Sequence, residues 1–379
     1  MRGDRRARRR SGPAGGRPGR RRERIRDHRV RAARIHRRAT GLLQGACPLA
    51  PHHHPADQER HREGGAHGDR GLTARATVVV RASQSRTPAR GAIVPIFHHR
   101  GRAVVYDRWG DGPPLVLLHN AGTQRHIWDD QVTVLRRSYE VFALDLPGYG
   151  ESERPADGYR LTDYARLLEA FLAAGGHTDV VLIGNCLGAA TSLRYAMTHP
   201  DNVRALVLIN PLTWNTVSGG RCGPLAWADA RLPLGPLADR LALPGPVVSR
   251  IINEQLGVRG RQRGLRHSPR LTAHWGDRGR LRALHGLVQD FPNYRELDTF
   301  TPTADFPPRC MIWGKQNRIL SAAAGARLAD TLRPQSSAVL SDCGHLPMVE
   351  DPERITGLIT EFLGSAAVRP YREAGPLAR

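Results

Sequence analysis

From about residue 93 onward, short apolar runs alternate with amphipathic stretches, and turn residues such as Gly, Pro and Asp separate them. Apolar runs of this length predict buried β-strands, and the amphipathic stretches between them predict helices. The alternation predicts the α/β class, with a mostly parallel central sheet and helices on both faces. The expected strands span residues 103–109, 114–118, 139–144, 180–183, 205–209, 308–313 and 338–340, and a last amphipathic helix is expected at 354–362.

The alternation is interrupted at residues 211–300, where prolines and arginines are frequent and no further strand is indicated. Short apolar patches such as 281–288 predict helices in this interval. Ligands of open α/β sheets bind beyond the carboxyl ends of the strands, so a segment inserted there would cover the pocket. We therefore expect a helical cap at 211–300 that selects the substrate, and a loop-rich dimerisation element is the alternative.

The first 91 residues lack this pattern, are rich in Arg, Gly, Pro and His, and precede the first aromatic residue, Phe97. Such a composition predicts a disordered extension, or a segment upstream of a true start near Val78 or Val94. Residues 41–46 are too short and too polar for the apolar part of a signal peptide. The expected organisation is an extension at 1–91, a first core segment at 92–210, the cap at 211–300, a second core segment at 301–365 and a tail at 366–379.

Charge is distributed unevenly over the 379 residues, whose formal net charge is +22. Residues 1–100 carry 25 arginines and 7 acidic residues, so the remainder of the chain is only +4. Dense arginine runs at 5–10 and 20–22 attract phosphate, but no aromatic side chain accompanies them on which bases could stack. We therefore expect no nucleic-acid partner.

Several classes of protein and site are not indicated by the residues present. No apolar run approaches the roughly 18 residues that span a bilayer, which predicts a soluble protein without a membrane partner. The cysteines have no regular spacing, which argues against a disulfide framework or a zinc site and fits a reducing cytoplasm. Histidine runs at 52–54 and 98–99 lack the companions of a defined metal site, and no phosphate-binding glycine loop follows a strand, so neither metal nor cofactor is expected. The five cysteines are Cys47, Cys186, Cys222, Cys310 and Cys343.

The run Gly184-Asn185-Cys186-Leu187-Gly188 carries the strongest chemical signal. A reactive side chain lies between two glycines, after an apolar strand and before a helix that begins with small residues at 188–196. This pattern predicts a nucleophile elbow, a sharp turn that exposes the nucleophile in a strained backbone conformation. The glycines are required because a Cβ at either position would collide with the neighbouring strand or helix.

Together with three further segments, the elbow resembles the α/β-hydrolase superfamily over residues 92–364. His119-Asn120-Ala121-Gly122 stands in the place of the oxyanion loop, and residues 145–152 resemble the loop after the next strand. Residues 342–352 resemble the segment that carries the catalytic histidine. The order of the four segments implies an α/β-hydrolase fold with an inserted cap.

The resemblance implies the roles of the candidate catalytic residues. Cys186 would be the nucleophile in the place of serine, and His345 the general base and acid. Asn317 stands where the family pattern has an aspartate, and Asn210 occupies the alternative position for an acid. A thiolate and an imidazolium already attract each other, so an amide that only orients the ring would suffice, as in papain-like proteases.

The oxyanion hole would be formed by the backbone N–H groups of Leu187 and Ala121. Asn120 replaces the usual glycine in this loop, and we expect Asn to keep the loop shape because it tolerates a positive φ. Asp145 and Ser152 are expected to fix the turn that follows the strand at 139–144.

The sequence thus predicts a hydrolase that cleaves an ester or thioester of a small organic substrate through an acyl intermediate on Cys186. An acyltransferase or cyclase that uses the same intermediate is one alternative. A non-catalytic binding protein, in which the chemistry was lost with the aspartate, is the other. Neither the natural substrate nor the oligomeric state is indicated by the sequence.

Overall fold

The fold is that of a computed structural model, which describes residues 79–81, 94–221, 223, 240 and 242–372. The described residues belong to one compact unit, and residues 1–71 lie outside the described part of the chain. The basic runs, the histidine run at 52–54, most of the expected extension at 1–91, Cys47 and Cys222 also lie outside them. The same holds for residues 224–239 of the expected cap and for residues 373–379 of the expected tail.

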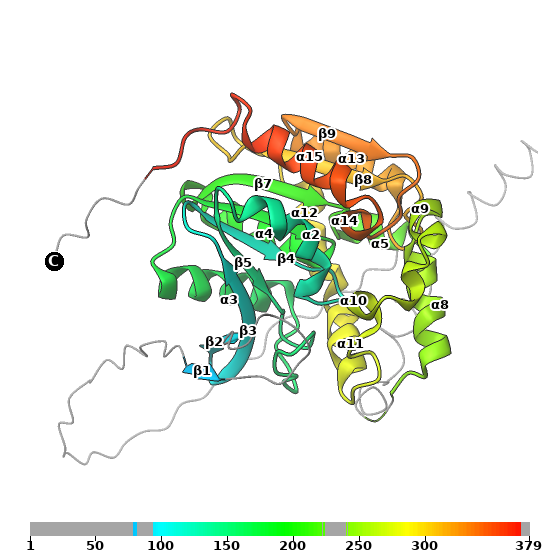
Figure 1. The fold of residues 1–379 in the computed structure, drawn as a ribbon. Coiled ribbons are helices and arrows are strands. Elements are labelled where there is room, and N and C mark those ends of the chain that lie inside the picture. The colour runs from blue at the N-terminus through cyan, green and yellow to red at the C-terminus, as the bar shows by residue number, and fades with distance from the viewer. Residues whose placement is uncertain (1–78, 82–93, 222, 224–239, 241, 373–379) are drawn as a thin grey trace, which may run out of the picture. The chain divides into compact units, whose positions relative to one another are not determined.

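A nine-stranded sheet forms the centre of the described chain (Figure 1), with the order β1-β2-β3-β5-β4-β6-β7-β8-β9. The strands β1 to β3 pair antiparallel and β3 pairs antiparallel with β5, whereas all pairs from β5 to β9 are parallel. The strands are β1 (Val79–Arg81), β2 (Val94–His99), β3 (Arg102–Trp109), β4 (Pro114–Leu118), β5 (Glu140–Leu144), β6 (Val180–Asn185), β7 (Val203–Ile209), β8 (Arg309–Gly314) and β9 (Ser336–Leu340).

Helices cover both faces of this sheet, because successive residues of a buried strand point to opposite faces. In β4, Val116 and Leu118 pack with helices α3, α4 and α13, whereas Leu115 and Leu117 pack with α2 and α15 on the other face. These helices are α2 (Asp129–Leu135), α3 (Leu161–Gly175), α4 (Leu187–Thr198), α13 (Ala322–Leu332) and α15 (Pro352–Leu363). Helices on both faces of a mostly parallel sheet confirm the predicted fold class.

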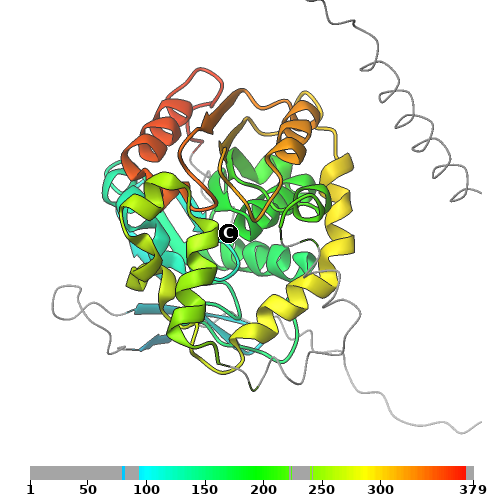
Figure 2. The ribbon, with the colours of Figure 1, turned by 90° about the vertical axis from the view of Figure 1, so that its right-hand side faces the viewer.

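The described part of the interval between β7 and β8 is helical. Helices α8 to α11 lie together beyond the strands, at the right of Figure 1 and towards the viewer in Figure 2. The helices of this interval are α5 (Trp214–Ser218), α8 (Gly245–Gln255), α9 (Val258–Gln262), α10 (Pro269–Thr272), α11 (Arg280–Asp290) and α12 (Arg295–Thr299). Short 3-10 helices in this interval span Leu265–His267 and Phe291–Tyr294. Outside it, 3-10 helices span Arg125–Trp128 and Pro200–Asn202, and α14 (Pro347–Glu350) precedes α15.

Two contacts at the ends of the described chain add to the expected organisation. The short strand β1 lies within the segment expected to be disordered, and its Val79 is paired with Ile96 of β2. The tail is partly fastened to the core, because the backbone N–H of Arg372 donates to Asp179 Oδ2 at 2.9 Å. The guanidinium of Arg369 lies 2.5 Å from the other oxygen of that carboxylate. Among the described residues, no helix is both long enough and apolar enough to cross a membrane.

Candidate functional site

Cys186 occupies the turn between β6 and α4, and it is one of the few described non-glycine residues with a positive φ. Its φ of 53° and ψ of −107° place it in a backbone conformation that residues other than glycine rarely adopt. Its N–H donates to the carbonyl of Ile209 at 3.0 Å, and its own carbonyl accepts from Ala190 and Leu212. The surrounding backbone therefore holds the strained turn in place, with the side chain at the start of helix α4.

Two glycines make this turn sterically feasible. A Cβ at Gly184 would overlap the backbone of Gly188 and Ala189, and a Cβ at Gly188 would overlap the backbone of Leu118 at the end of β4. The elbow therefore packs backbone against backbone on both sides of Cys186. This is the steric reason given in the sequence analysis for the glycine spacing.

The loop after β4 lies directly against the elbow, because the N–H of Gly188 donates to the carbonyl of His119 at 3.1 Å. His119 is fully buried, and this burial lowers its pKa to about 4, so the ring is neutral at neutral pH. Its Nε2 accepts from the N–H of Leu146 at 2.9 Å, so the proton is on Nδ1, which donates to the carbonyl of Asn120 at 2.8 Å. A neutral histidine thus joins the loops after β4 and β5.

The two amides expected to form the oxyanion hole flank this contact. Within the described residues, no hydrogen bond is recorded for the backbone N–H of Leu187 or of Ala121. Amides of this kind are available to bind a developing oxyanion. The expectation for Asn120 is wrong in one respect, because its φ is not positive and Gly122 takes that conformation instead, with a φ of 91°. Asn120 holds the loop through its side chain, whose Oδ1 accepts from Thr123 Oγ1 at 2.5 Å.

His345 follows β9 and is 2 % exposed. Its carbonyl accepts from Asn185 Nδ2 at 3.3 Å and from Asn210 Nδ2 at 3.1 Å, so it lies beside the residue that precedes the nucleophile. Burial alone lowers the pKa of His345 to about 3. Burial therefore favours the neutral form of this imidazole.

Asn317 lies on the loop after β8, which runs beside the histidine loop, since the N–H of Gln316 donates to the carbonyl of Cys343 at 2.9 Å. The side chain of Asn317 has a local role: its Oδ1 accepts from the N–H groups of Ile319 at 3.0 Å and of Leu320 at 3.1 Å. Asn317 Nδ2 and His345 Nδ1 are both buried without a hydrogen-bond partner. No hydrogen bond between the two side chains is recorded in the described part of the chain.

Residues that the sequence analysis did not single out also hold the site. Asn185 and the backbone of Gln255 bind the main chain of His345, and the Glu350 carboxylate binds the amides on both sides of it. Glu350 lies within residues 342–352, the segment expected to carry the catalytic histidine, but nothing in the sequence indicates which groups its carboxylate binds. Asn210, considered as an alternative acid position, uses its Oδ1 to accept from the N–H of Gly314 at 3.0 Å.

The loop after β5 is fixed largely as expected. Ser152 Oγ donates to the carbonyl of Asp145 at 2.6 Å and accepts from the N–H of Val105 at 2.8 Å. The sequence analysis missed the buried guanidinium of Arg125, which pairs with Asp145 and with two further carboxylates. Those partners are Asp107 at 2.6 Å and Glu151 at 2.6 Å.

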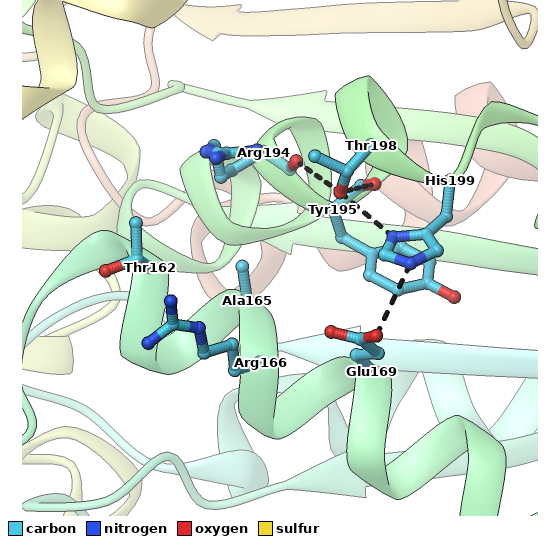
Figure 3. Close-up of a pocket in the computed structure, with 8 residues that line it drawn as sticks. All are labelled: Thr162, Ala165, Arg166, Glu169, Arg194, Tyr195, Thr198 and His199. Carbon is cyan, nitrogen blue, oxygen red and sulfur yellow. Dashed lines mark hydrogen bonds and ion pairs between the residues drawn. The ribbon is translucent and has the colours of Figure 1, made fainter.

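A separate pocket of about 150 Å³ lies between α3 and α4 (Figure 3), and it contains none of the residues expected in the site. Within it, His199 stacks on Tyr195 with ring centroids 4.7 Å apart and lies 3.5 Å from Glu169. We therefore do not assign it to the site. The described residues contain no cluster of three or more His, Cys, Asp or Glu side chains that could hold a metal ion.

Comparison with known proteins agrees with this geometry. The family model of the alpha/beta hydrolase fold matches residues 113–352. A 2-hydroxy-6-oxo-6-(2'-aminophenyl)hexa-2,4-dienoic acid hydrolase of Metapseudomonas resinovorans is 24 % identical over 76 % of this chain and 97 % of its own length. The crystal structure of the esterase RhEst1 from a Rhodococcus species is 26 % identical, with a TM-score of 0.56, over 70 % of this chain and 96 % of the esterase. An alpha/beta hydrolase fold protein from Burkholderia ambifaria has a TM-score of 0.61 at 23 % identity, over 70 % of this chain and 96 % of its own.

Proposed function

The chain belongs to the family of the alpha/beta hydrolase fold, and on this premise we propose that it hydrolyses an ester or thioester of a small organic substrate through an acyl intermediate on Cys186. Its relatives include hydrolases and esterases, which supports ester hydrolysis in general. The observation that carries the cysteine chemistry is the strained elbow, which places a thiol where the family fold presents its nucleophile.

The first half of the proposed reaction acylates the thiol. Cys186 Sγ attacks the carbonyl carbon of the substrate while its proton passes to the neutral imidazole of His345. The negative charge that develops on the carbonyl oxygen is bound by the N–H groups of Ala121 and Leu187. When the intermediate collapses, the alkoxide or thiolate takes the proton from His345 and leaves.

The second half of the reaction returns the enzyme to its resting state. Water gives a proton to His345 as it attacks the thioester carbon, and the carboxylic acid product leaves as Cys186 recovers its proton. The neutral imidazole is the form that accepts a proton in both steps. No cofactor takes part in this scheme.

We assign Asn317 a supporting role. It shapes the loop beside His345 by accepting the N–H groups of Ile319 and Leu320. An uncharged amide cannot stabilise the imidazolium that forms during each half-reaction. We therefore expect acylation to be slower than in an enzyme that carries a carboxylate at this position.

Mass spectrometry tests the proposal directly. Incubation with p-nitrophenyl acetate and with acyl thioesters is expected to leave an acyl adduct on Cys186 that is absent from Cys186→Ala. Iodoacetamide is expected to label Cys186 faster than Cys310 and Cys343, because burial raises the pKa of those thiols to about 11 and about 12. A protein that forms no adduct and labels all three thiols equally slowly would instead be a binding protein with this fold.

A further inference from the structure

The position of His345 needs an explanation, because its ring lacks the carboxylate that would orient it. Ring nitrogen Nδ1 has no partner, and the pKa of the ring is lowered by burial without a counteracting negative charge. The side chain of Asn317 is turned to its own loop. The hydrogen bonds shown for this residue are on its main chain.

The backbone amides of residues 344–346 are all hydrogen-bonded. The N–H groups of Gly344 and Leu346 both donate to Glu350 Oε1, at 2.9 and 3.2 Å. Between them, the N–H of His345 donates to the carbonyl of Gln255 at 2.6 Å. One carboxylate oxygen thus bridges the two residues that flank His345, which fixes the direction in which its side chain leaves the backbone.

The second oxygen of Glu350 extends this arrangement to the base of the cap interval. Glu350 Oε2 accepts from the N–H of Gly257 at 2.6 Å, and Gly260 also donates to this carboxylate. Arg263 Nη1 donates to the backbone carbonyl of Glu350 at 2.9 Å. The carboxyl group of Glu350 therefore binds both the segment 255–263 and the histidine loop, in addition to the bond between His345 and Gln255.

Glu350 has no cationic side chain to neutralise it. It is fully buried, no ion pair of its carboxylate is recorded within the described residues, and its partners are backbone amides. A buried carboxylate of this kind is costly unless several donors satisfy it. An apolar residue in its place would leave these backbone amides without an acceptor.

We propose that Glu350 is the positioning residue of His345, holding the amides of Gly344, Leu346 and Gly257 so that the imidazole is directed at Cys186 although its Nδ1 has no partner. The inference rests on the proposed function of Cys186 and His345. Glu350 supplies the orientation that a triad carboxylate supplies elsewhere, but not its charge next to the ring. Orientation and charge stabilisation are thereby separated in this chain.

Glu350→Gln tests the inference, with Glu353→Gln as the matched control on the exposed side of the same segment. Gln keeps the shape but replaces one acceptor oxygen by an amide group that faces backbone donors. The rate constant for acylation of Cys186 by p-nitrophenyl acetate, measured per competent site from the burst amplitude, is expected to fall by about ten- to a hundredfold. The substrate concentration at half-saturation is expected to stay the same, and Glu353→Gln is expected to match the wild type.

A purely structural role would give a different result. It would lower the burst amplitude, which counts folded sites, and leave the rate constant per site unchanged; that outcome would overturn the inference. If Glu350→Gln does not fold, Gly260→Ala serves in its place, because the added Cβ lies 2.8 Å from Glu350 Oε2 and displaces it only slightly. The same rate constant is then expected to fall by a smaller factor, and an unchanged value would overturn the inference.

The inference remains testable if the wild type forms no acyl adduct, in which case the proposed function fails first. NMR of the protein with isotope-labelled histidine then reports the His345 ring nitrogens directly. Their signals are expected to shift or broaden in Glu350→Gln or Gly260→Ala and to be unchanged in Glu353→Gln. Unchanged His345 signals in the first two variants would contradict a positioning role for Glu350.

Discussion

Cys186 and His345 enter the site from two regions that are held in different ways. On the nucleophile side, β6, the elbow and α4 follow one another along the chain, and the backbone of Cys186 is bonded to neighbouring strands and loops. On the histidine side, the main chain of His345 is bonded to Gln255, Asn185 and Asn210, which come from distant parts of the sequence.

The difference shows which parts of such a site tolerate chemical change. The elbow is a steric arrangement in which glycines are in contact with backbone, so a change there disturbs the fold itself. The histidine is held through its main chain, so the residue in the place of the triad acid can be an amide while the loop keeps its shape. We therefore expect damage on the first side to appear as lost stability, and change on the second side to appear in the rate.

Gly188→Ala is expected to have the largest effect and tests the nucleophile side. The added Cβ would overlap the backbone of Leu118, and helix α4 cannot move away from β4 without cost. We expect a loss of about 3 kcal/mol or more in the free energy of unfolding, measured by urea titration. Gly357→Ala, in α15 with open space around its Cβ, is the control and is expected to be neutral or slightly stabilising. Equal stability of both variants would contradict a tightly packed elbow.

Acidification tests both sides together, because each contains a buried neutral imidazole. In the unfolded chain His119 and His345 take up protons near pH 6.5, whereas burial holds their folded pKa values at about 4 and about 3. Between these values the unfolded state binds more protons, so stability is lost as the pH falls below about 6.5.

The expected loss between about pH 7 and about pH 4.5 is about 5 kcal/mol, about 2.5 kcal/mol from each imidazole, measured by urea unfolding at each pH. His345→Gln is expected to remove the contribution of His345 to this loss of stability and to leave the contribution of His119, on the oxyanion loop. If stability does not change over this range, the two imidazoles are not buried in the neutral form.

Asn317→Asp has the smallest expected effect and concerns the rate alone. A carboxylate can still accept the N–H groups of Ile319 and Leu320, and its charge beside the histidine loop would raise the pKa of His345 and stabilise the imidazolium. We expect the acylation rate constant at neutral pH to rise by about tenfold, with stability nearly unchanged.

Burst kinetics across a pH series measures this effect. Asn317→Ala is the control, because it leaves the same two N–H groups without their acceptor and is expected to react more slowly than the wild type. A rate that does not respond to either substitution would remove Asn317 from the site.

Local features were predicted best from the sequence. The strand at 114–118 has the expected bounds, and the turn at Cys186 has the expected strained backbone, because apolar runs and glycine spacing carry both. The strand β1 was not predicted, since three residues within a polar extension have no periodicity that could reveal them.

Contacts between distant segments could not be predicted from one sequence. The bond between Glu350 and Gly257 joins residues far apart in the chain, and it depends on where the cap interval returns to the core. The same limit applies to Arg125, whose three carboxylate partners come from β3 and from the loop after β5. The neutral state of His345 also depends on burial, which a motif does not reveal.

The attachment of the tail to Asp179 has a practical consequence for handling the protein. Asp179 immediately precedes β6, the strand that ends at the elbow, and its carboxylate receives both Arg369 and the N–H of Arg372. Ending the chain before Arg369, with or without an affinity tag, would remove both partners of the Asp179 carboxylate at the start of β6. Purification tags and truncations at this end should therefore begin after Arg372.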